Sequence, residues 1–192
     1  GCAATSGEVE LLALSDNAGM STIRTIHDLR ALYAQPTERA IKKQIGALDK
    51  HCKNFIALSP FVLLASTDRA HNLDASPRGG APGFVKVNAN GEILIPDFPG
   101  NNRLDSLENI LHTGKVGLLF LIPGFEETLR VNGQAILSVA PEEIAACADE
   151  KRSPKLVIKV QVEAAYLHCA KAFLRSKLWE PSSQVPRQTL PT

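Results

Sequence analysis

The order of its short apolar segments constrains the fold of this chain more than any other feature. Between residues 61 and 166, about six segments have the apolar, β-branched composition of strands, and short turns join most of them. One internal helix is expected among them, which Asn101 and Asn102 can cap. Because strands and helices do not alternate, the pattern argues against a doubly wound nucleotide-binding fold. It predicts a mainly β (α+β) protein, an antiparallel barrel with helical cover.

The clearest local signal within this series is a hairpin. Residues 84–87 and 92–95 flank the turn sequence Asn88-Ala89-Asn90-Gly91, which is typical of a tight connection between two strands. Residues 73–76 are expected to be extended. The remaining strands are predicted at residues 61–67, 116–122, 128–137 and 155–166.

Helices are predicted on both sides of the strand series. Residues 26–33 form a short helix, and Thr37 caps a longer one that continues to about Leu58. A short helix starts at Pro141, and a last one covers about residues 168–178. The long helix has an apolar stripe of Ile41, Ile45, Leu48, Cys52, Phe55 and Ile56, and the internal helix one of Leu104, Leu107, Ile110 and Leu111.

The length of 192 residues predicts one domain, which we place at residues 20–180. Met20-Ser21-Thr22 resembles a natural start, so we expect residues 1–19 to be an upstream extension or an added segment. Residues 181–192 contain Pro and Ser and are expected to form a flexible tail.

Composition and charge exclude several classes of protein. The net charge is +1, so no global field attracts nucleic acid or a membrane, and no apolar run reaches the ~20 residues of a membrane span. The four Cys have no CxxC spacing and the five His no ligand spacing, so we expect free cysteines, no metal site and a cytoplasmic location. Basic residues dominate from Lys151 onward, forming either a solvated face or a wall beside a phosphorylated ligand.

Two segments, residues 76–83 and 96–103, are dense in Gly, Pro, Arg and Asn. Arg103 falls in the expected first turn of a helix, where a cation opposes the helix dipole unless an anion is bound. Two interpretations remain open for it: a phosphate site, or a capped helix with Arg103 paired to Asp97 or Asp105. Arg78 is similarly either a turn residue or a second contact to phosphate or a ring.

Several short motifs, taken in order along the chain, carry a resemblance to a known family. The motifs are Ser76-Pro77-Arg78-Gly79, Ile95-Pro96-Asp97, Gly100-Asn101-Asn102-Arg103-Leu104-Asp105-Ser106-Leu107, Val116-Gly117-Leu118-Leu119-Phe120 and Thr128-Leu129-Arg130-Val131-Asn132-Gly133. Together they resemble the pyridoxamine 5′-phosphate oxidase-like family of flavin-nucleotide-binding proteins. The resemblance implies a six-stranded antiparallel split β-barrel, a homodimer, and FMN bound in two clefts at the subunit interface.

The resemblance also implies roles for individual residues. The stretch that contains Asn101, Asn102 and Arg103 matches the loop that holds the FMN phosphate, and Asn102 stands where the family often has a second basic residue. Thr128 falls where the oxidases carry a flavin-contacting glutamine, offered from the partner subunit. Ile95, Pro96 and Asp97 match the strand end beside the flavin ring and ribityl chain, and Ser76, Arg78 and Gly79 match the preceding strand.

The expected function is that of an FMN-dependent oxidoreductase, which passes hydride or electrons through the flavin N5 to an unidentified small-molecule substrate. The sequence assigns no catalytic residue. The oxidases' basic-apolar strand motif is replaced here by Ser-Pro-Arg-Gly-Gly, which argues against oxidation of a vitamin B6 phosphate. The alternative is a non-enzymatic module of the same fold that holds FMN, haem or a deazaflavin. A basic-faced regulatory protein is a minor third hypothesis.

Overall fold

The computed structural model describes residues 22–100 and 102–191 of the chain. The expected extension at residues 1–19 and the candidate site residue Asn101 lie outside the described residues. The chain divides into two units, Gly1–Glu38 and Arg39–Thr192. The first unit contains α1 (Ile26–Ala31), which begins where expected. Thr25 caps it, because its hydroxyl accepts a hydrogen bond from the Asp28 N–H (3.1 Å).

The prediction of a single long helix over residues 37–58 is wrong, because two separate helices occupy this stretch. They are α2 (Glu38–Lys42) and α3 (Lys50–Leu58). Between them, Ile45 forms an isolated β-bridge with Ala165, which takes the backbone out of helical geometry. Asp49 then caps α3 by accepting the Cys52 N–H at 2.8 Å.

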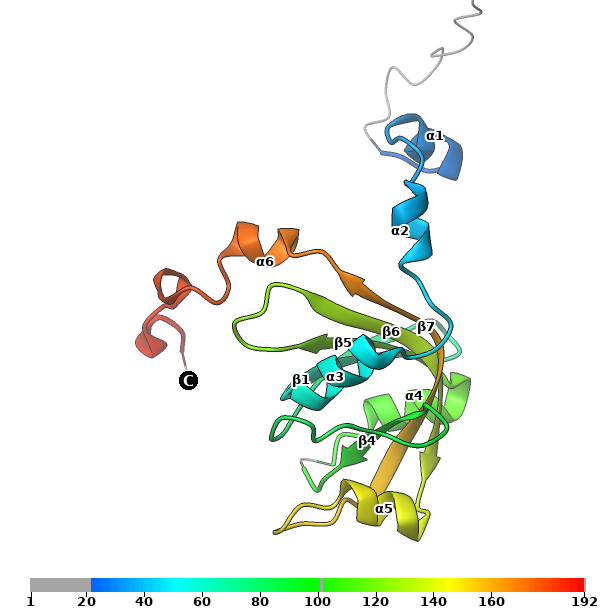
Figure 1. Cartoon of the computed structure of the whole chain (residues 1–192), viewed down its shortest axis with the longest axis vertical. Coiled ribbons are helices and arrows are strands. Elements are labelled where there is room, and N and C mark those ends of the chain that lie inside the picture. Colours follow the sequence, from blue (N-terminus) through cyan, green and yellow to red (C-terminus); the bar gives the residue numbers. More distant parts are fainter. Residues whose placement is uncertain (1–21, 101, 192) are drawn as a thin grey trace, which may run out of the picture. The chain divides into compact units, whose positions relative to one another are not determined.

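A strongly curled antiparallel sheet forms the body of the second unit (Figure 1). Its strand order is β2-β1-β5-β6-β7-β4-β3, with every neighbouring pair antiparallel. Seven strands are present instead of the expected six, since the extended stretch after residue 72 pairs fully with β1. They are β1 (Phe61–Thr67), β2 (Leu73–Gly79), β3 (Lys86–Val87), β4 (Ile93–Asp97), β5 (Lys115–Leu121), β6 (Thr128–Ser138) and β7 (Leu156–His168).

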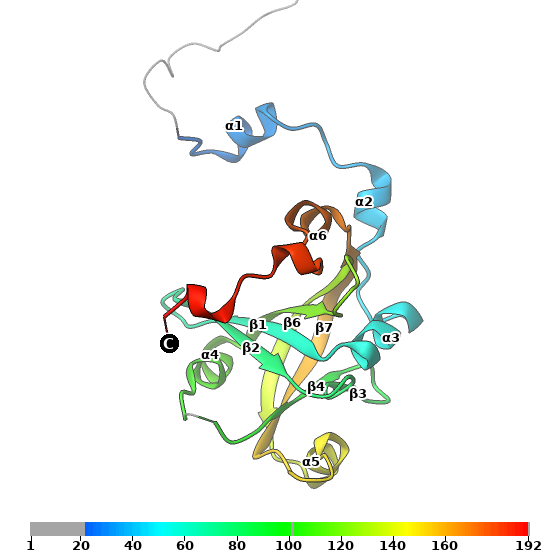
Figure 2. The same ribbon diagram turned by 90° about the vertical axis from the view of Figure 1, so that its left-hand side faces the viewer.

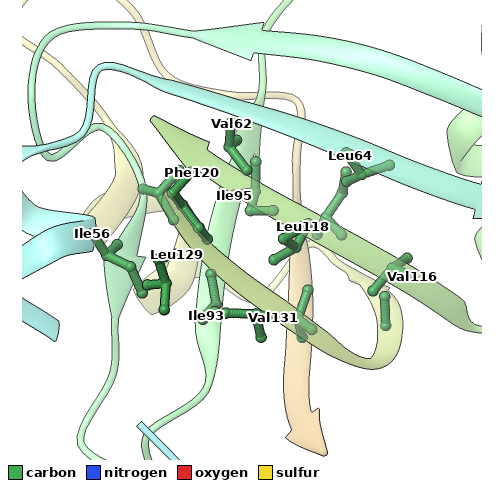
Figure 3. Packing of buried hydrophobic residues seen from close by; sticks show 14 of the residues in the cluster. Ile56, Val62, Leu64, Ile93, Ile95, Val116, Leu118, Phe120, Leu129 and Val131 are labelled. Carbon is green, nitrogen blue, oxygen red and sulfur yellow. The ribbon is translucent and has the colours of Figure 1, made fainter. Parts of the chain in front are cut away.

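The core lies inside the curl of this sheet. Alternate residues of β1 and β5 point into it, among them Val62, Leu64 and Phe120, all fully buried (Figure 3). The helices α3 and α4 (Asp105–Thr113) lie on opposite sides of the strands (Figure 2). Because aromatic residues are only 5% of the chain, aliphatic side chains fill most of this core.

The sheet ends at two edges, β2 and β3, and no backbone pairing joins them within the described part of the chain. The curl nevertheless brings β2 close to β4. The Arg78 guanidinium on β2 forms an ion pair with the Asp97 carboxylate on β4. Both side chains are 18% exposed. A side-chain bridge therefore spans the place where backbone hydrogen bonds would close a full barrel.

The strands β6 and β7 form the longest antiparallel ladder in the sheet. It pairs Thr128 with His168 at one end and Ser138 with Val157 at the other, and its register shifts at Gly133. A Cβ atom at Gly133 would lie 2.2 Å from the Gln161 carbonyl oxygen, so the backbones approach too closely for any side chain. The bulge therefore requires glycine.

Helix α5 (Pro141–Cys147) connects β6 to β7 in sequence, and the remaining elements follow β7. Helix α5 packs against β4 and β7, and the short α6 (Lys171–Ser176) follows β7. Two single-turn segments, Pro181–Ser183 and Arg187–Thr189, complete the described chain. Within residues 22–100 and 102–191, no helix has the length and apolar character needed to cross a membrane.

An ion pair between Glu143 on α5 and Lys159 on β7 (2.9 Å) holds this helix to the sheet. The Ser138 hydroxyl and the Lys159 ammonium lower the pKa of Glu143 below its ordinary value of 4.5. Such a carboxyl contributes stability above its unfolded pKa and loses it as pH falls through the folded pKa.

The substitution Glu143→Gln should lower the free energy of unfolding by about 1–2 kcal/mol at pH 7, because Lys159 loses a charged partner. The deficit relative to wild type should shrink as pH falls from 4.5 through the folded pKa, which lies below 4.5, because the wild-type carboxylate then becomes protonated too. Urea unfolding at pH 7 and pH 3 measures both values, with exposed Glu142→Gln as the control. A deficit independent of pH would contradict the assignment.

Candidate functional site

A cleft of about 350 Å³ opens between β2, the end of β4 and the loop that leads into α4. Three cationic side chains and one carboxylate line it, together with a proline-rich and aromatic wall. The lining residues are Ser76, Pro77, Arg78, Asp97, Phe98, Pro99, Gly100, Asn102, Arg103, Leu104 and Lys155.

The strand β2 contributes a row of polar side chains to this cleft and its surroundings. Strand alternation places Asp74, Ser76 and Arg78 on one face, while their neighbours along the strand are exposed. The Arg78 Nε donates to Ser76 Oγ (3.3 Å), and its Nη1 pairs with Asp97. Asp74 accepts a hydrogen bond from Ser106 Oγ of α4 (2.6 Å). The position of Arg78 is therefore held from two sides.

The loop before α4 differs from its prediction. Asn102 has a left-handed backbone (φ 60°), a conformation that Asn tolerates better than most residues, and Leu104 occupies the N-cap position without a side-chain cap. The expected cap by Asn102 is therefore wrong. Arg103 forms an ion pair with Asp105 (3.0 Å), as one of the two open interpretations proposed, and its side chain is 77% exposed.

Lys155 is a cleft residue that sequence reasoning did not single out. The pairing of β4 with β7 brings it to the cleft, where its backbone N–H donates to the Asp97 carbonyl (3.0 Å). It belongs to the basic segment from Lys151 onward, for which a wall beside a phosphorylated ligand was one interpretation. That charge imbalance was the only available signal.

The other predicted site residues lie apart from the cleft lining. Gly79 is the exposed last residue of β2, one position beyond Arg78. Ile95 and Pro96 are buried in β4, with the Ile95 side chain in the core. Thr128 is 5% exposed at the first position of β6, the end of the β6–β7 ladder opposite to the one that adjoins β4.

Two further hollows are less suited to chemistry. A hollow of about 540 Å³ lies beside α3 and β3 and includes Lys53 and Lys86, both exposed, and one of about 130 Å³ lies near Cys147.

Burial raises the pKa of the Cys52 and Cys147 thiols to about 11, so both remain protonated at neutral pH. In the part of the chain that the structure describes, no group of His, Cys, Asp and Glu forms a metal site.

A sequence model of the pyridoxamine 5′-phosphate oxidase family matches residues 48–169, from the segment before α3 to the end of β7. The match covers more than half of the chain and includes every strand of the curled sheet. The chain belongs to the pyridoxamine 5′-phosphate oxidase family. No curated protein sequence matches it.

Several solved structures are similar to this chain at low sequence identity. HupZ of Group A Streptococcus is 16% identical, with a TM-score of 0.50 over 62% of this chain and 93% of that chain. An FMN-binding protein of Syntrophomonas wolfei is 14% identical (TM-score 0.46; 60% of this chain, 80% of that one). An F420 reductase is 11% identical (TM-score 0.46; 62% and 98%).

Proposed function

We propose that the chain is a flavoprotein that binds FMN with its phosphate in the cleft between β2 and the loop before α4. The observation that carries the proposal is the convergence of Arg78, Arg103 and Lys155 around one hollow at the N-terminal end of α4. Guanidinium and ammonium groups are the side chains that bind phosphate most strongly, and a helix N-terminus adds a favourable dipole.

The size and lining of the cleft fit one part of FMN. At about 350 Å³ the cleft is at the small end of ligand sites, enough for the phosphate and part of the ribityl chain. Phe98 and Pro77 add apolar surface, and Ser76 and Asn102 add hydrogen-bonding groups for hydroxyls. The flavin ring would then extend beyond the hollow of a single chain.

Each cleft residue has a definite task in this proposal. The Arg78 guanidinium, which pairs with Asp97 in the free protein, donates hydrogen bonds to the phosphate as well. Lys155 and Arg103 balance the remaining negative charge of the phosphate. Asp97 then accepts hydrogen bonds from ligand hydroxyls. When bound, FMN supplies hydride or electron transfer, so the protein needs chiefly to position the group and shield it from water.

We also propose a homodimeric split barrel in which a second copy completes the site. Thr128 is not part of the cleft lining of its own chain, and in this proposal it contacts the flavin that the partner subunit holds. Gly79, Ile95 and Pro96 are next to cleft residues in sequence, on β2 and β4, and remain proposed contacts of the flavin. Asn101 remains a proposed phosphate ligand, as the neighbour of Asn102. The substrate is a small molecule that reaches the exposed face of the flavin.

A haem-binding module of the same fold is the less favoured alternative. Of the described residues that line the cleft, none is His, Cys or Met, the side chains that most often ligate haem iron. A flavin or deazaflavin requires no such ligand. Turnover of NADH or NADPH with an electron acceptor distinguishes an oxidoreductase from a module that only holds the cofactor.

The absorbance spectrum of freshly purified protein is the first test, followed by titration of flavin-free protein with FMN. We expect the flavin bands near ~370 and ~450 nm and a ligand of FMN mass. A protein that is colourless and does not bind added FMN would overturn the proposal. Flavin bands without turnover would support the binding module instead of the enzyme.

The substitution Arg103→Ala should weaken FMN binding by about five- to tenfold, because it removes one exposed phosphate contact. Quenching of flavin fluorescence measures the dissociation constant. The control is Lys115→Ala, which removes another exposed cation from β5, a strand that contributes nothing to the cleft lining. Equal affinity of Arg103→Ala and wild type would remove Arg103 from the phosphate site.

A further inference from the structure

Four side chains lie together on the outward face of β6 and β7, at the end of these strands that carries Thr128 and His168. The register pairs Thr128 with His168 and Arg130 with Tyr166. Their neighbours Leu129 and Val131 point inward and are fully buried in the core, so the four share the other face. We call Arg130, Tyr166 and His168 the Arg130 cluster.

The members of the Arg130 cluster contact one another closely. The Arg130 guanidinium carbon lies 4.2 Å from the centre of the Tyr166 ring, and the Tyr166 and His168 ring centres are 4.5 Å apart. Stacking on an aromatic face orients a guanidinium without using its N–H groups. This stacking therefore leaves the N–H donors of Arg130 unused.

Arg130 lacks the partner that a half-buried cation normally has. Its Nε is buried without a hydrogen-bond acceptor, and no ion pair to it occurs within the described residues. Burying such a group without an acceptor is unfavourable, more so when it is charged, so native proteins rarely leave one without a partner. An anion that is a ligand of the protein would satisfy it.

The electrostatic surroundings of His168 favour a bound anion. Partial burial and the positive charge of Arg130 lower the pKa of His168, so its imidazole is mostly neutral at pH 7. Among the described residues, the charge that acts on His168 is that of Arg130 of β6, and the ring that contacts it is Tyr166 of β7. No carboxylate of the described residues offsets the charge of Arg130 there.

We propose that the Arg130 cluster binds the carboxylate or phosphate group of a small molecule. The Arg130 fork supplies two parallel N–H donors to an oxyanion, and the Tyr166 hydroxyl and the His168 ring add further donors. None of these three residues lines the cleft that contains Arg78 in the same chain.

The proposal is tested on flavin-free protein by NMR of the His168 ring, which is assigned by comparison with His168→Gln. Inorganic phosphate and acetate are titrated separately at constant ionic strength. A bound anion offsets the charge of Arg130, so the ring signals should shift to saturation and the pKa of His168 should rise. Saturation by phosphate, by acetate or by both identifies the preferred oxyanion.

Variants of Arg130 supply the matched comparison. The substitution Arg130→Gln should weaken anion binding by at least about tenfold, and Arg130→Lys, which keeps the charge but lacks the fork, should weaken it less. The exposed Lys50→Gln should bind as wild type. Signals that show no saturable response to either anion in wild type, or the same response in Arg130→Gln, would overturn the proposal.

Discussion

Flavin binding should fall by about a hundredfold when Arg78 is replaced by glutamine. Arg78 is the most enclosed cation of the cleft, at 18% exposed, and it already holds the Asp97 carboxylate. The substitution Arg78→Gln removes the phosphate contact and leaves Asp97 uncompensated beside the place where phosphate would lie. Both effects oppose binding of an anion, so the loss should exceed that from the exposed Arg103. Fluorescence titration with FMN measures it.

The double variant Arg78→Gln/Asp97→Asn separates a ligand role from a role in folding. It removes the ion pair that joins β2 to β4 but leaves no unpaired charge, so its unfolding should resemble that of wild type more than the single variant does. It should still bind FMN at least about tenfold more weakly than wild type. Restoration of wild-type affinity would mean that Arg78 serves only to neutralise Asp97.

Stability should fall by about 3 kcal/mol or more in Gly133→Ala, the largest effect expected of a single methyl group in this chain. The added Cβ would lie 2.2 Å from the Gln161 carbonyl oxygen and 3.0 Å from Val160 Cγ1. Backbone of the neighbouring strand cannot move away without breaking the β6–β7 ladder. The urea midpoint of unfolding measures the loss.

Gly46 is the matched control for Gly133. A Cβ there would lie 3.9 Å from the Glu163 carbonyl oxygen, an ordinary contact. The substitution Gly46→Ala should therefore change the free energy of unfolding by less than about 0.5 kcal/mol. If Gly133→Ala unfolds at the same urea concentration as Gly46→Ala, the bulge does not need its glycine.

Local patterns in the sequence predicted most of the strands, while long-range contacts decided what was missed. The Asn88 turn forms as expected because the Asn88 carboxamide oxygen accepts the N–H groups of Asn90 and Glu92 and Gly91 has φ 79°. The stretch around Ile45 has helical periodicity, but its backbone bonds to Ala165, 120 positions later. Periodicity reports which face is buried and carries no information on such a partner.

The internal helix shows the same limit at the scale of single side chains. Leu107 and Ile110 are buried as its stripe predicts, whereas Leu104 is 46% and Leu111 70% exposed. The helix starts only at Asp105, and the edge of its apolar face is left open to solvent. A stripe fixes the centre of a buried face better than its margins.

The candidate site was predicted in part. Its loops were found because glycine, proline and arginine occur there at high density, and Ser76, Arg78, Asp97, Asn102 and Arg103 do line one cleft. Lys155 was missed because only the pairing of β4 with β7 brings it there. The Arg130 cluster was missed because its evidence is an absent partner, which no sequence pattern records.

The sheet itself separates the two arginine sites of one chain. Val62 pairs with Arg78 and with Phe120, and Phe120 pairs with Leu129, so Arg78 lies at the level of Leu129, three strands away. Arg78 shares the inward face with Val62 and Leu129, whereas Arg130, the next residue after Leu129, is on the opposite face. In the proposed homodimer, any active centre that used both would consist of two half-sites from different subunits. Mixed dimers of Arg78→Gln and Arg130→Gln chains would then contain one intact centre and one doubly defective one, and so recover activity by complementation.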